Sequence, residues 1–293
     1  MLVTLNEMLP KARKERYAVP AFDVGNYEMV RAVIEVCDQM RSPALFMCLK
    51  PDLEGNGLGF LSEMIRHAAK IYDAIPVCLH LDHATDLEDI KKAIDAGFTS
   101  VMYDGSTLPF EKNAKNTKEV VIYAHQRGIS TEAELGHVTD AIAGSGESAL
   151  TGCTEEDIEN ALTNVDEVKE FIRITDVDCL AVAIGTAHGV YVKSPFLRLD
   201  RLEKINSVSV RPLVLHGGSG TPDDDIRKAI SLGITKINIF SEVLNGLNSG
   251  LKEKLNGLEN MSSWPSVVYK KAISNMKEVI RRKIEVFGSV NRI

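Results

Sequence analysis

Three histidines follow apolar runs that are typical of buried strands. His83 ends the run PVCLHLDH, His188 follows DCLAVAIGTA, and His216 ends RPLVLH. A single histidine in such a position is more often a structural residue. Three imidazoles from different strands can instead bind one tetrahedral Zn²⁺ and leave its fourth position open to a substrate. The pattern therefore predicts a zinc site.

Carboxylates stand close to these histidines in the same runs. Asp82 precedes His83, Asp104 ends FTSVMYD, and Glu132 and Glu134 share one face of ISTEAEL. We expect Asp104 and Glu134 to take a second metal position or to orient the ligands. Of the remaining histidines, His80 is expected inside the fold and His67 and His125 on the surface, while His137 stays unassigned.

A second group of residues is suited to binding an anion. HGGSGTPDDDIRKAI is typical of a glycine-rich turn that opens a helix, where backbone N–H groups and the helix N-terminus face outward. A GGSG turn alone is a weak signal, but the end of the following strand adds further polar groups. The residues expected to hold a phosphate are Gly189, Gly217, Gly218, Ser219, Asn238 and Ser241.

Lys236, inside the run ITKINIF, has two interpretations. A lysine in such a position can form a Schiff base with a ketone, which would give carbonyl chemistry without a metal. It can also pair with inward-facing carboxylates. Because three histidines converge, we favour the ion pair.

Eight short apolar runs must position these groups. They cover residues 18–22, 43–48, 76–82, 98–104, 129–135, 178–185, 211–217 and 234–240. Segments of helical period separate them, and several end in glycine, a common helix stop. Strands that alternate with helices form parallel sheets with right-handed crossovers. Eight such units predict an α/β fold, the TIM (β/α)8 barrel, with an open doubly wound sheet as the alternative.

Length alone allows two domains, at about 150 residues each, or one large barrel. The alternation favours a single (β/α)8 barrel domain over residues 1–293, with extra C-terminal helices from about 245 to 293. The longest interval between strands contains a βα loop over about 136–159, rich in Gly, Ala, Ser and Thr. On the catalytic face of a barrel, such a loop is a candidate mobile lid; the alternative is a tolerated surface insertion.

Composition excludes several classes of function. The 293 residues carry a net charge of −7, which argues against binding of nucleic acid by electrostatic attraction. No apolar segment approaches the length of about 18 residues that a membrane span needs. The five scattered cysteines include no CxxC pair, and the N-terminus does not have the pattern of a signal peptide. We therefore expect a cytoplasmic protein with reduced thiols and no membrane partner.

From about residue 4 to 289, the chain resembles the zinc-dependent class II aldolases that act on fructose bisphosphate and tagatose bisphosphate. The likeness is carried, in the family's order, by LHLDHA, AGFTSVMYDGS, EAELG, LAVAIGTAHGVY, PLVLHGGSG, KINIFSE and the terminal FGS. It implies reversible cleavage of a ketose phosphate to dihydroxyacetone phosphate and an aldehyde.

The resemblance also implies a role for each matching residue. His83, His188 and His216 would bind the catalytic zinc, with Glu134 and Asp104 at an alternate or second metal position. Asp82 would polarise and protonate the aldehyde oxygen. The six residues of the glycine-rich group would hold dihydroxyacetone phosphate, with K⁺ or Na⁺ nearby in many members. The family's base is a glutamate on the loop after the fifth strand, for which Glu147 is the candidate.

The sequence departs from the family pattern around the other half of the sugar. Ala84 follows LDH where glycine is usual, Asp23 replaces an asparagine, and the segment with Leu49 lacks a serine. Thr139-Asp140 replaces a glycine pair, and Phe240 stands at a usual phosphate-site position. The reaction type is therefore better defined than the sugar.

Other functions fit the same residues less well. The sugar could be a different phosphorylated ketose or a keto acid phosphate, and a barrel metal hydrolase or isomerase could use the same three histidines. A non-catalytic partner subunit is disfavoured, because Asp82 and the three histidines are all present. Relatives in the family imply a homodimer or homotetramer.

Overall fold

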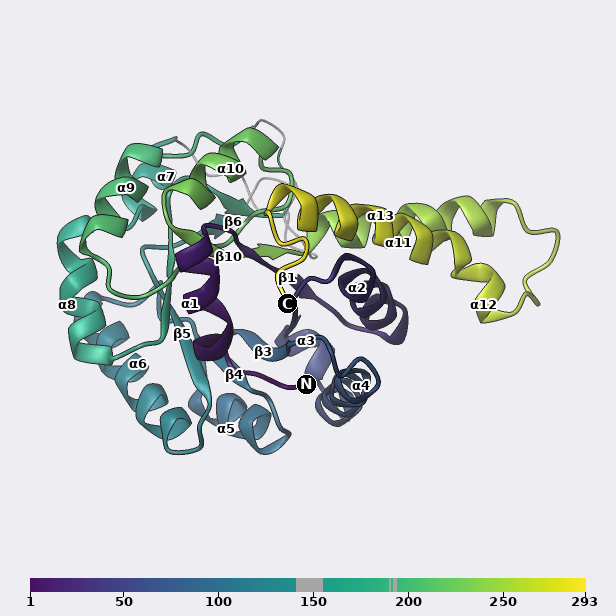
Figure 1. The fold of residues 1–293 in the computed structure, drawn as a ribbon, viewed down its shortest axis with the longest axis horizontal. Helices are drawn as coiled ribbons and strands as arrows, with labels where there is room; N and C mark the ends of the chain where they lie inside the picture. Colours follow the sequence, from purple (N-terminus) through teal and green to yellow (C-terminus); the bar gives the residue numbers. More distant parts are fainter. Residues whose placement is uncertain (141–154, 190, 192–193) are drawn as a thin grey trace.

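The computed structural model describes residues 1–140, 155–189, 191 and 194–293. Eight parallel strands close into a barrel in the order β1-β10-β9-β7-β5-β4-β3-β2 (Figure 1). They are β1 (Val19–Asp23), β2 (Ala44–Cys48), β3 (Val77–Ala84), β4 (Ser100–Tyr103), β5 (Ser130–Leu135), β7 (Cys179–Val182), β9 (Leu213–Leu215) and β10 (Ile234–Ile239). The expected TIM barrel is confirmed, and the open doubly wound sheet is excluded.

Side chains alternate along the strands between two apolar cores, because successive residues of a strand point to opposite faces. One core lies inside the barrel and includes Val19, Ala21, Leu45, Met47, Cys78, Cys179, Ala181 and Val214. The larger core lies between the barrel and the helices and includes Phe22, Phe46, Leu79 and Leu81. Strands buried on both faces explain the continuous apolar runs in the sequence.

An outer layer of helices connects the strands. It consists of α2 (Tyr27–Met40), α3 (Lys50–Leu53), α4 (Gly57–Ile71), α5 (Leu87–Asp95), α6 (Phe110–His125), α7 (Glu155–Ala161), α8 (Val165–Thr175), α9 (Leu199–Val208) and α10 (Asp223–Ser231). Side chains of Asn26 and Asp86 cap α2 and α5 by accepting backbone N–H groups. Gly97 and Gly128 follow α5 and α6 with positive φ, as expected for helix stops.

Two short strands were not expected from the sequence. β6 (Thr139–Asp140) and β8 (Ala187–His188) pair in parallel as a separate two-stranded sheet beside the barrel. β6 begins the long loop expected over about 136–159, and α7 lies at its end. The middle of that loop, residues 141–154, lies outside the described residues.

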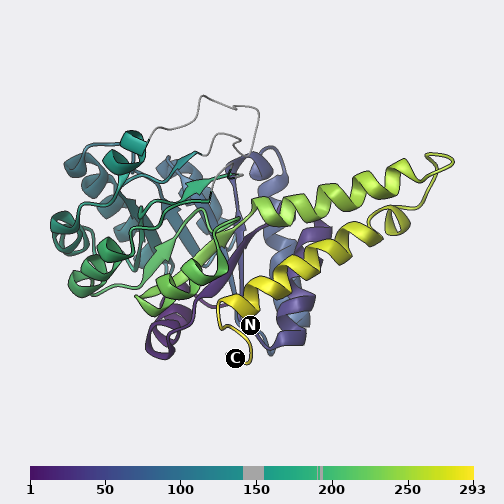
Figure 2. The ribbon, with the colours of Figure 1, turned by 90° about the horizontal axis from the view of Figure 1, so that it is seen from above.

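The C-terminal helices form a projecting arm, which we define as α11 (Ser241–Asn256), α12 (Pro265–Val268) and α13 (Lys270–Val286). Figures 1 and 2 show α11 and α13 running side by side away from the barrel, with α12 at the far end. A Cβ at Gly250 would lie 2.5 Å from Cα of Ala272, so this glycine allows the two helices to approach closely. Near the barrel, α13 also contacts α2.

No helix in the described residues combines the length and the apolar character that a bilayer span requires.

Helix α1 (Leu5–Glu15) covers the end of the barrel where the strands begin (Figure 1). Its buried residues Leu5, Met8, Leu9 and Ala12 join the inner core. Asp178, just before β7, anchors this end. Its Oδ2 accepts hydrogen bonds from the backbone N of Thr131 at 2.6 Å and from Nε2 of His125 at 2.8 Å, and its Oδ1 accepts one from Asn6 at 2.8 Å. His125 is exposed, as expected, and it also takes part in this structural network.

We expect Asp178→Ala to lower the free energy of unfolding by about 2–4 kcal/mol, because it leaves the buried N–H and hydroxyl of Thr131 without an acceptor. Denaturant titration measures this change. The exposed Asp200→Ala is the control and should stay within about 0.5 kcal/mol of the unmodified protein. Since the network lies at the end of the barrel opposite the mouth, a large loss of turnover in a folded Asp178→Ala protein would contradict this assignment.

Candidate active site

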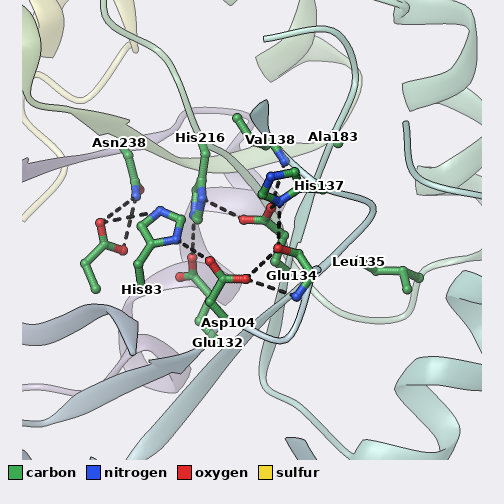
Figure 3. A network of polar contacts seen from close by, with 12 residues as sticks. His83, Asp104, Glu132, Glu134, Leu135, His137, Val138, Ala183, His216 and Asn238 are labelled. Carbon is green, nitrogen blue, oxygen red and sulfur yellow. Dashed lines mark hydrogen bonds and ion pairs between the residues drawn. The ribbon is translucent and has the colours of Figure 1, made fainter. Parts of the chain in front are cut away.

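The three predicted histidines come together at the mouth of the barrel, where the strands end. The ring centroids of His83 lie 4.8 Å from His188 and 4.7 Å from His216. One nitrogen from each ring can be chosen so that all three lie within 4.8 Å of one another, and the same holds for ligand atoms of His83, Asp104 and Glu134. Figure 3 shows His83, His216, Asp104 and Glu134 gathered in one polar network.

His83 reaches this cluster through an irregularity of β3. The pairing of β3 with β4 shifts register between Leu81 and Ala84, and His83 has a left-handed φ of 48°. In a regular strand, His83 would point to the same side as Leu81, into the helix layer, because Asp82 occupies the inward position. The irregular backbone places His83 and Asp82 at the mouth together, at a conformational cost of about 1–3 kcal/mol.

A chain of hydrogen bonds fixes the orientation of His83. Its Nδ1 lies 2.8 Å from Oδ2 of Asp104, while Oδ1 of Asp104 accepts the hydroxyl of Ser106 at 2.6 Å. Nδ1 of His137 then donates to the Ser106 oxygen at 2.9 Å, since the hydroxyl hydrogen is already used. Because Asp104 can only accept when ionised, His83 carries its hydrogen on Nδ1 and presents Nε2 to the centre of the cluster. His137, which the sequence left unassigned, therefore lies at the far end of this chain of hydrogen bonds, beside Ser106.

His216 is held by two carboxylates of β5. Its Nε2 lies 2.9 Å from Oε1 of Glu132, so this nitrogen donates. Its Nδ1 lies 3.0 Å from Oε2 of Glu134, but these two buried atoms make no hydrogen bond within the described part of the chain. Two adjacent buried groups of this kind, an imidazole nitrogen and a carboxylate oxygen, are suitable ligands for a divalent cation. The residues present therefore fit a metal site.

His188 enters the cluster from β8 rather than from β7, and the small sheet of β6 and β8 sets its position. Burial, and then the charges on His83 and His216, hold the pKa of His188 well below its usual value. The ring is therefore neutral, which is the form that binds metals.

His83 and His216 titrate in the opposite direction. Burial opposes a charge on His83, but the charge of Asp82 and the hydrogen bond to Asp104 outweigh it and raise the pKa of His83 to about 9. Burial also opposes a charge on His216, but its contacts with Glu132 and Glu134 raise the pKa of that ring to about 10. At neutral pH, the rings of His83 and His216 are therefore protonated. A cation that binds to them must displace these protons.

Asp82 lies beside the histidines and is almost fully buried. Its Oδ2 is 3.9 Å from Nε2 of His83, and both of its oxygens are 3.4 Å from Nδ2 of Asn238. Burial alone would raise the pKa of Asp82, but the charges on His83 and Lys236 outweigh burial and lower it. Asp82 is therefore ionised and ready to accept a proton.

The glycine-rich turn adopts the backbone that its sequence suggests. Gly217 has a φ of 66°, and a Cβ at Gly218 would lie 2.4 Å from Cγ2 of Ile237, so neither position has room for a side chain. The hydroxyl oxygen of Ser219 accepts the backbone N–H groups of Phe240 at 3.1 Å and Glu242 at 3.4 Å. The turn is thus joined to the start of α11, where Ser241 is the first residue.

Gly189 also has a positive φ, of 100°, directly after His188. Asn238 lies deeper, between Lys236 and Asp82, rather than at the turn. Glu147, the candidate base, lies outside the described residues. The structure therefore brings together Asp82, the three histidines, Asp104, Glu134 and Asn238, and places the glycine-rich turn at the start of α11.

Several supporting residues were not identified from the sequence. The Tyr191 hydroxyl accepts the N–H of Ala187 at 2.7 Å and donates to the carbonyl of Gly217 at 2.9 Å, which links the His188 loop to the turn. Glu242 accepts the N–H of Gly220 at 2.9 Å and pairs with the buried Lys283 of the arm at 2.7 Å. The roles of Tyr191 and Glu242 are revealed only by tertiary contacts. For Lys236 and Asn238 the sequence does hold a signal, because their i, i+2 spacing places both on one face of β10.

Divalent cation binding should release protons, because His83 and His216 are protonated without a cation. We expect the apparent affinity for Zn²⁺ to rise from about pH 6 to about pH 8, by up to about tenfold per unit for each displaced proton. Calorimetric titration in buffers of different ionisation enthalpy measures the number released. A binding enthalpy that is the same in every buffer, with a flat affinity, would contradict the proposed protonation.

Comparison with known proteins places this site in a family. The family model described as fructose-bisphosphate aldolase class-II matches residues 3–292. The YdjI aldolase from Escherichia coli K12 is 32% identical, with a TM-score of 0.85, over 100% of this chain and 99% of that chain. A Coccidioides immitis protein assigned as a fructose-1,6-bisphosphate aldolase is 30% identical, with a TM-score of 0.82, over 97% and 96% of the two chains.

The fructose-bisphosphate aldolase from Campylobacter jejuni shares the fold, with a TM-score of 0.80 at 21% identity over 100% of this chain and 97% of that chain. The family match over nearly the whole chain agrees with a mouth built from three histidines, an ionised aspartate and a glycine-rich turn. The protein therefore belongs to the class II fructose-bisphosphate aldolase family and is an aldolase, a carbon–carbon lyase.

Proposed function

We propose that the protein reversibly cleaves a ketose bisphosphate, of the fructose-1,6- or tagatose-1,6-bisphosphate type, to dihydroxyacetone phosphate and an aldehyde, with Zn²⁺ as cofactor. The observation that carries the proposal is the buried Nδ1 of His216, which no hydrogen bond of the described residues satisfies, beside the rings of His83 and His188. Imidazole nitrogens in threes are typical ligands of catalytic Zn²⁺. A bound Zn²⁺ would act as a Lewis acid on the ketone and hydroxyl oxygens of the substrate.

His83, His188 and His216 are the proposed zinc ligands. Asp104 supports this assignment by holding the Nδ1 hydrogen of His83, and Glu132 does the same for the Nε2 hydrogen of His216. Glu134 and Asp104 would form an alternate or second metal position together with His83.

Asp82 is the proposed proton-transfer group at the aldehyde oxygen. In the cleavage direction, its carboxylate takes the proton from the hydroxyl that becomes the aldehyde, while the carbon–carbon bond breaks. In the condensation direction, it returns that proton. Its lowered pKa supports an ionised carboxylate at neutral pH, which is the form that can accept the hydroxyl proton. We propose Glu147 as the base that removes the carbon-bound proton of dihydroxyacetone phosphate in the condensation direction and returns it to the enediolate in the cleavage direction.

The phosphate of dihydroxyacetone phosphate is proposed to bind at the glycine-rich turn. Gly217, Gly218 and Ser219 would receive it, with Ser241 at the N-terminus of α11, where the helix dipole favours an anion. Gly189 and Asn238 would complete that half of the site. The buried hydroxyls of Thr139 and Thr186, which make no hydrogen bond in the described part of the chain, support a K⁺ or Na⁺ position near β6.

A different phosphorylated ketose or a keto acid phosphate is the second candidate. Asp23 ends β1 at the mouth, and its buried Oδ1 has no hydrogen-bond partner among the described residues. Burial and the nearby Asp82 raise the pKa of Asp23. Such a group suits a hydroxyl of the aldehyde half better than a second phosphate.

We also propose a cytoplasmic homodimer or homotetramer. Four cysteines, Cys37, Cys48, Cys78 and Cys179, are buried and form no disulfide among the described residues. The arm carries exposed Met261, Trp264 and Val267 at and before α12, and exposed apolar groups of this size often mark contacts between subunits.

A substrate panel assayed for dihydroxyacetone phosphate tests the reaction. We expect release from fructose or tagatose bisphosphate that chelation abolishes and Zn²⁺ restores. Preference for a monophosphorylated ketose would instead support the second candidate. Release that persists in chelator, accompanied by a borohydride-trapped adduct, would contradict the metal-dependent mechanism.

Asp82→Ala should abolish most turnover, by about 10²–10⁴-fold, because proton transfer to and from the hydroxyl loses its positioned group. Zn²⁺ content, measured by atomic absorption after dialysis, should stay at the level of the unmodified protein. Equal loss of metal would instead make Asp82 a ligand.

A further inference from the structure

Lys236 occupies the centre of the barrel and is completely buried. Its Nζ lies 2.9 and 3.1 Å from the two oxygens of Glu132 and 2.8 Å from Oδ1 of Asn238. Burial opposes its charge, but Glu132 and Asp82 outweigh burial and raise the pKa of Lys236. The group is therefore an ammonium rather than the neutral amine that a Schiff base requires. The proposed reaction gives Lys236 no direct task.

One contact leads from Lys236 to the metal site. Lys236 contacts both oxygens of Glu132, and Oε1 of Glu132 also accepts the hydrogen bond from Nε2 of His216 at 2.9 Å. Nε2 therefore carries a hydrogen toward Glu132, and Nδ1 is the ring nitrogen that faces Glu134 at 3.0 Å and is placed to bind a cation. Without Lys236, the carboxylate of Glu132 would lose the two contacts that fix its oxygens, and the ring of His216 would no longer be held with Nδ1 directed toward Glu134.

The other contact leads to Asp82. An ammonium group can only donate hydrogen bonds, so Asn238 must turn its acceptor atom, Oδ1, toward Lys236. The amide Nδ2 then points to Asp82, 3.4 Å from each carboxylate oxygen. Lys236 therefore determines which end of the amide faces the proton-transfer group. If the amide were reversed, two acceptors would face each other.

We propose that Lys236 is a positioning residue, which sets the ligand nitrogen of His216 through Glu132 and the orientation of Asn238 toward Asp82. This inference rests on the proposed metal-dependent cleavage and extends it to a group that does not touch the substrate. One buried cation would thus prepare both the metal ligand and the proton-transfer group before either is used.

The test compares Lys236→Met with the unmodified protein and with Lys277→Met, a half-buried lysine that pairs with Glu35 on the outside of the barrel. Chelator-stripped Lys236→Met should bind Zn²⁺ about 10–100-fold more weakly. At saturating Zn²⁺, its kcat should fall by about 10²-fold, with KM changed much less, because the glycine-rich turn is untouched. The control should match the unmodified protein in both measurements.

Two further variants separate the contacts without removing Lys236. Glu132→Gln should weaken Zn²⁺ binding, while Asn238→Ala should keep the metal affinity and lose kcat. The double variant Lys236→Met/Glu132→Gln should bind Zn²⁺ no more weakly than the weaker single variant, because both act through one path. A purely structural lysine would lower stability without this division of effects. If Lys236→Met fails to fold, the Glu132 and Asn238 variants decide the question.

Unchanged Zn²⁺ affinity in Lys236→Met or Glu132→Gln would overturn the inference. A borohydride-trapped substrate adduct on Lys236, located by peptide mass, would also overturn it, because Lys236 would then be catalytic. The metal titrations need no substrate. A protein that binds Zn²⁺ as described but releases no dihydroxyacetone phosphate would therefore refute the proposed reaction separately.

Discussion

The constraint on which this structure depends is charge balance in a barrel interior that water does not reach. Removing a single ion from water costs several kcal/mol, so each buried charge needs a partner. Glu132 and Lys236 are both fully enclosed, and they neutralise each other at 2.9 Å. The remaining polar groups arrange themselves around this pair. In addition to this ion pair, Glu132 accepts a hydrogen bond from His216, and Lys236 donates one to Asn238.

The interior of the barrel changes in character along its axis. Near α1 it is filled by apolar side chains such as Leu45, Met47 and Val214. Toward the mouth the inward positions are Asp82, Glu132, Glu134 and Asn238, and the histidines stand above them. A rigid apolar base thus supports a polar layer whose groups are already oriented. Preorganised dipoles and charges of this kind are the largest usual source of catalytic stabilisation.

Much of the fold could be predicted from the sequence, because fully buried strands appear as continuous apolar runs. Each of the eight expected runs coincides with a strand of the barrel, although β1 extends one residue and β3 two residues beyond the expected run. The short sheet of β6 and β8 could not be predicted, since two residues per strand give no periodic signal. The length of the projecting arm was also not evident, because a helical pattern does not say whether a helix packs on the barrel or extends from it.

The site was predictable to the extent that it depends on residue type. The convergence of His83, His188 and His216 follows from their places at or just beyond the ends of three parallel strands of one barrel. Which nitrogen His83 and His216 present depends on Asp104 and Glu132, which are distant from them in sequence. The link from Asp104 through Ser106 to His137 is equally non-local. Contacts of this kind appear only when the strands have a definite register. The role of Glu147 still rests on the family resemblance alone.

The backbone of His83 has a consequence for anyone who wishes to transfer this site to another barrel. Copying Asp82 and His83 onto a regular strand would point only one of them toward the mouth, because neighbouring residues diverge there. The register shift before Ala84 and the left-handed turn at His83 would have to be grafted together with the side chains. In this protein, the template for two adjacent functional groups is therefore a local interruption of the strand that carries them.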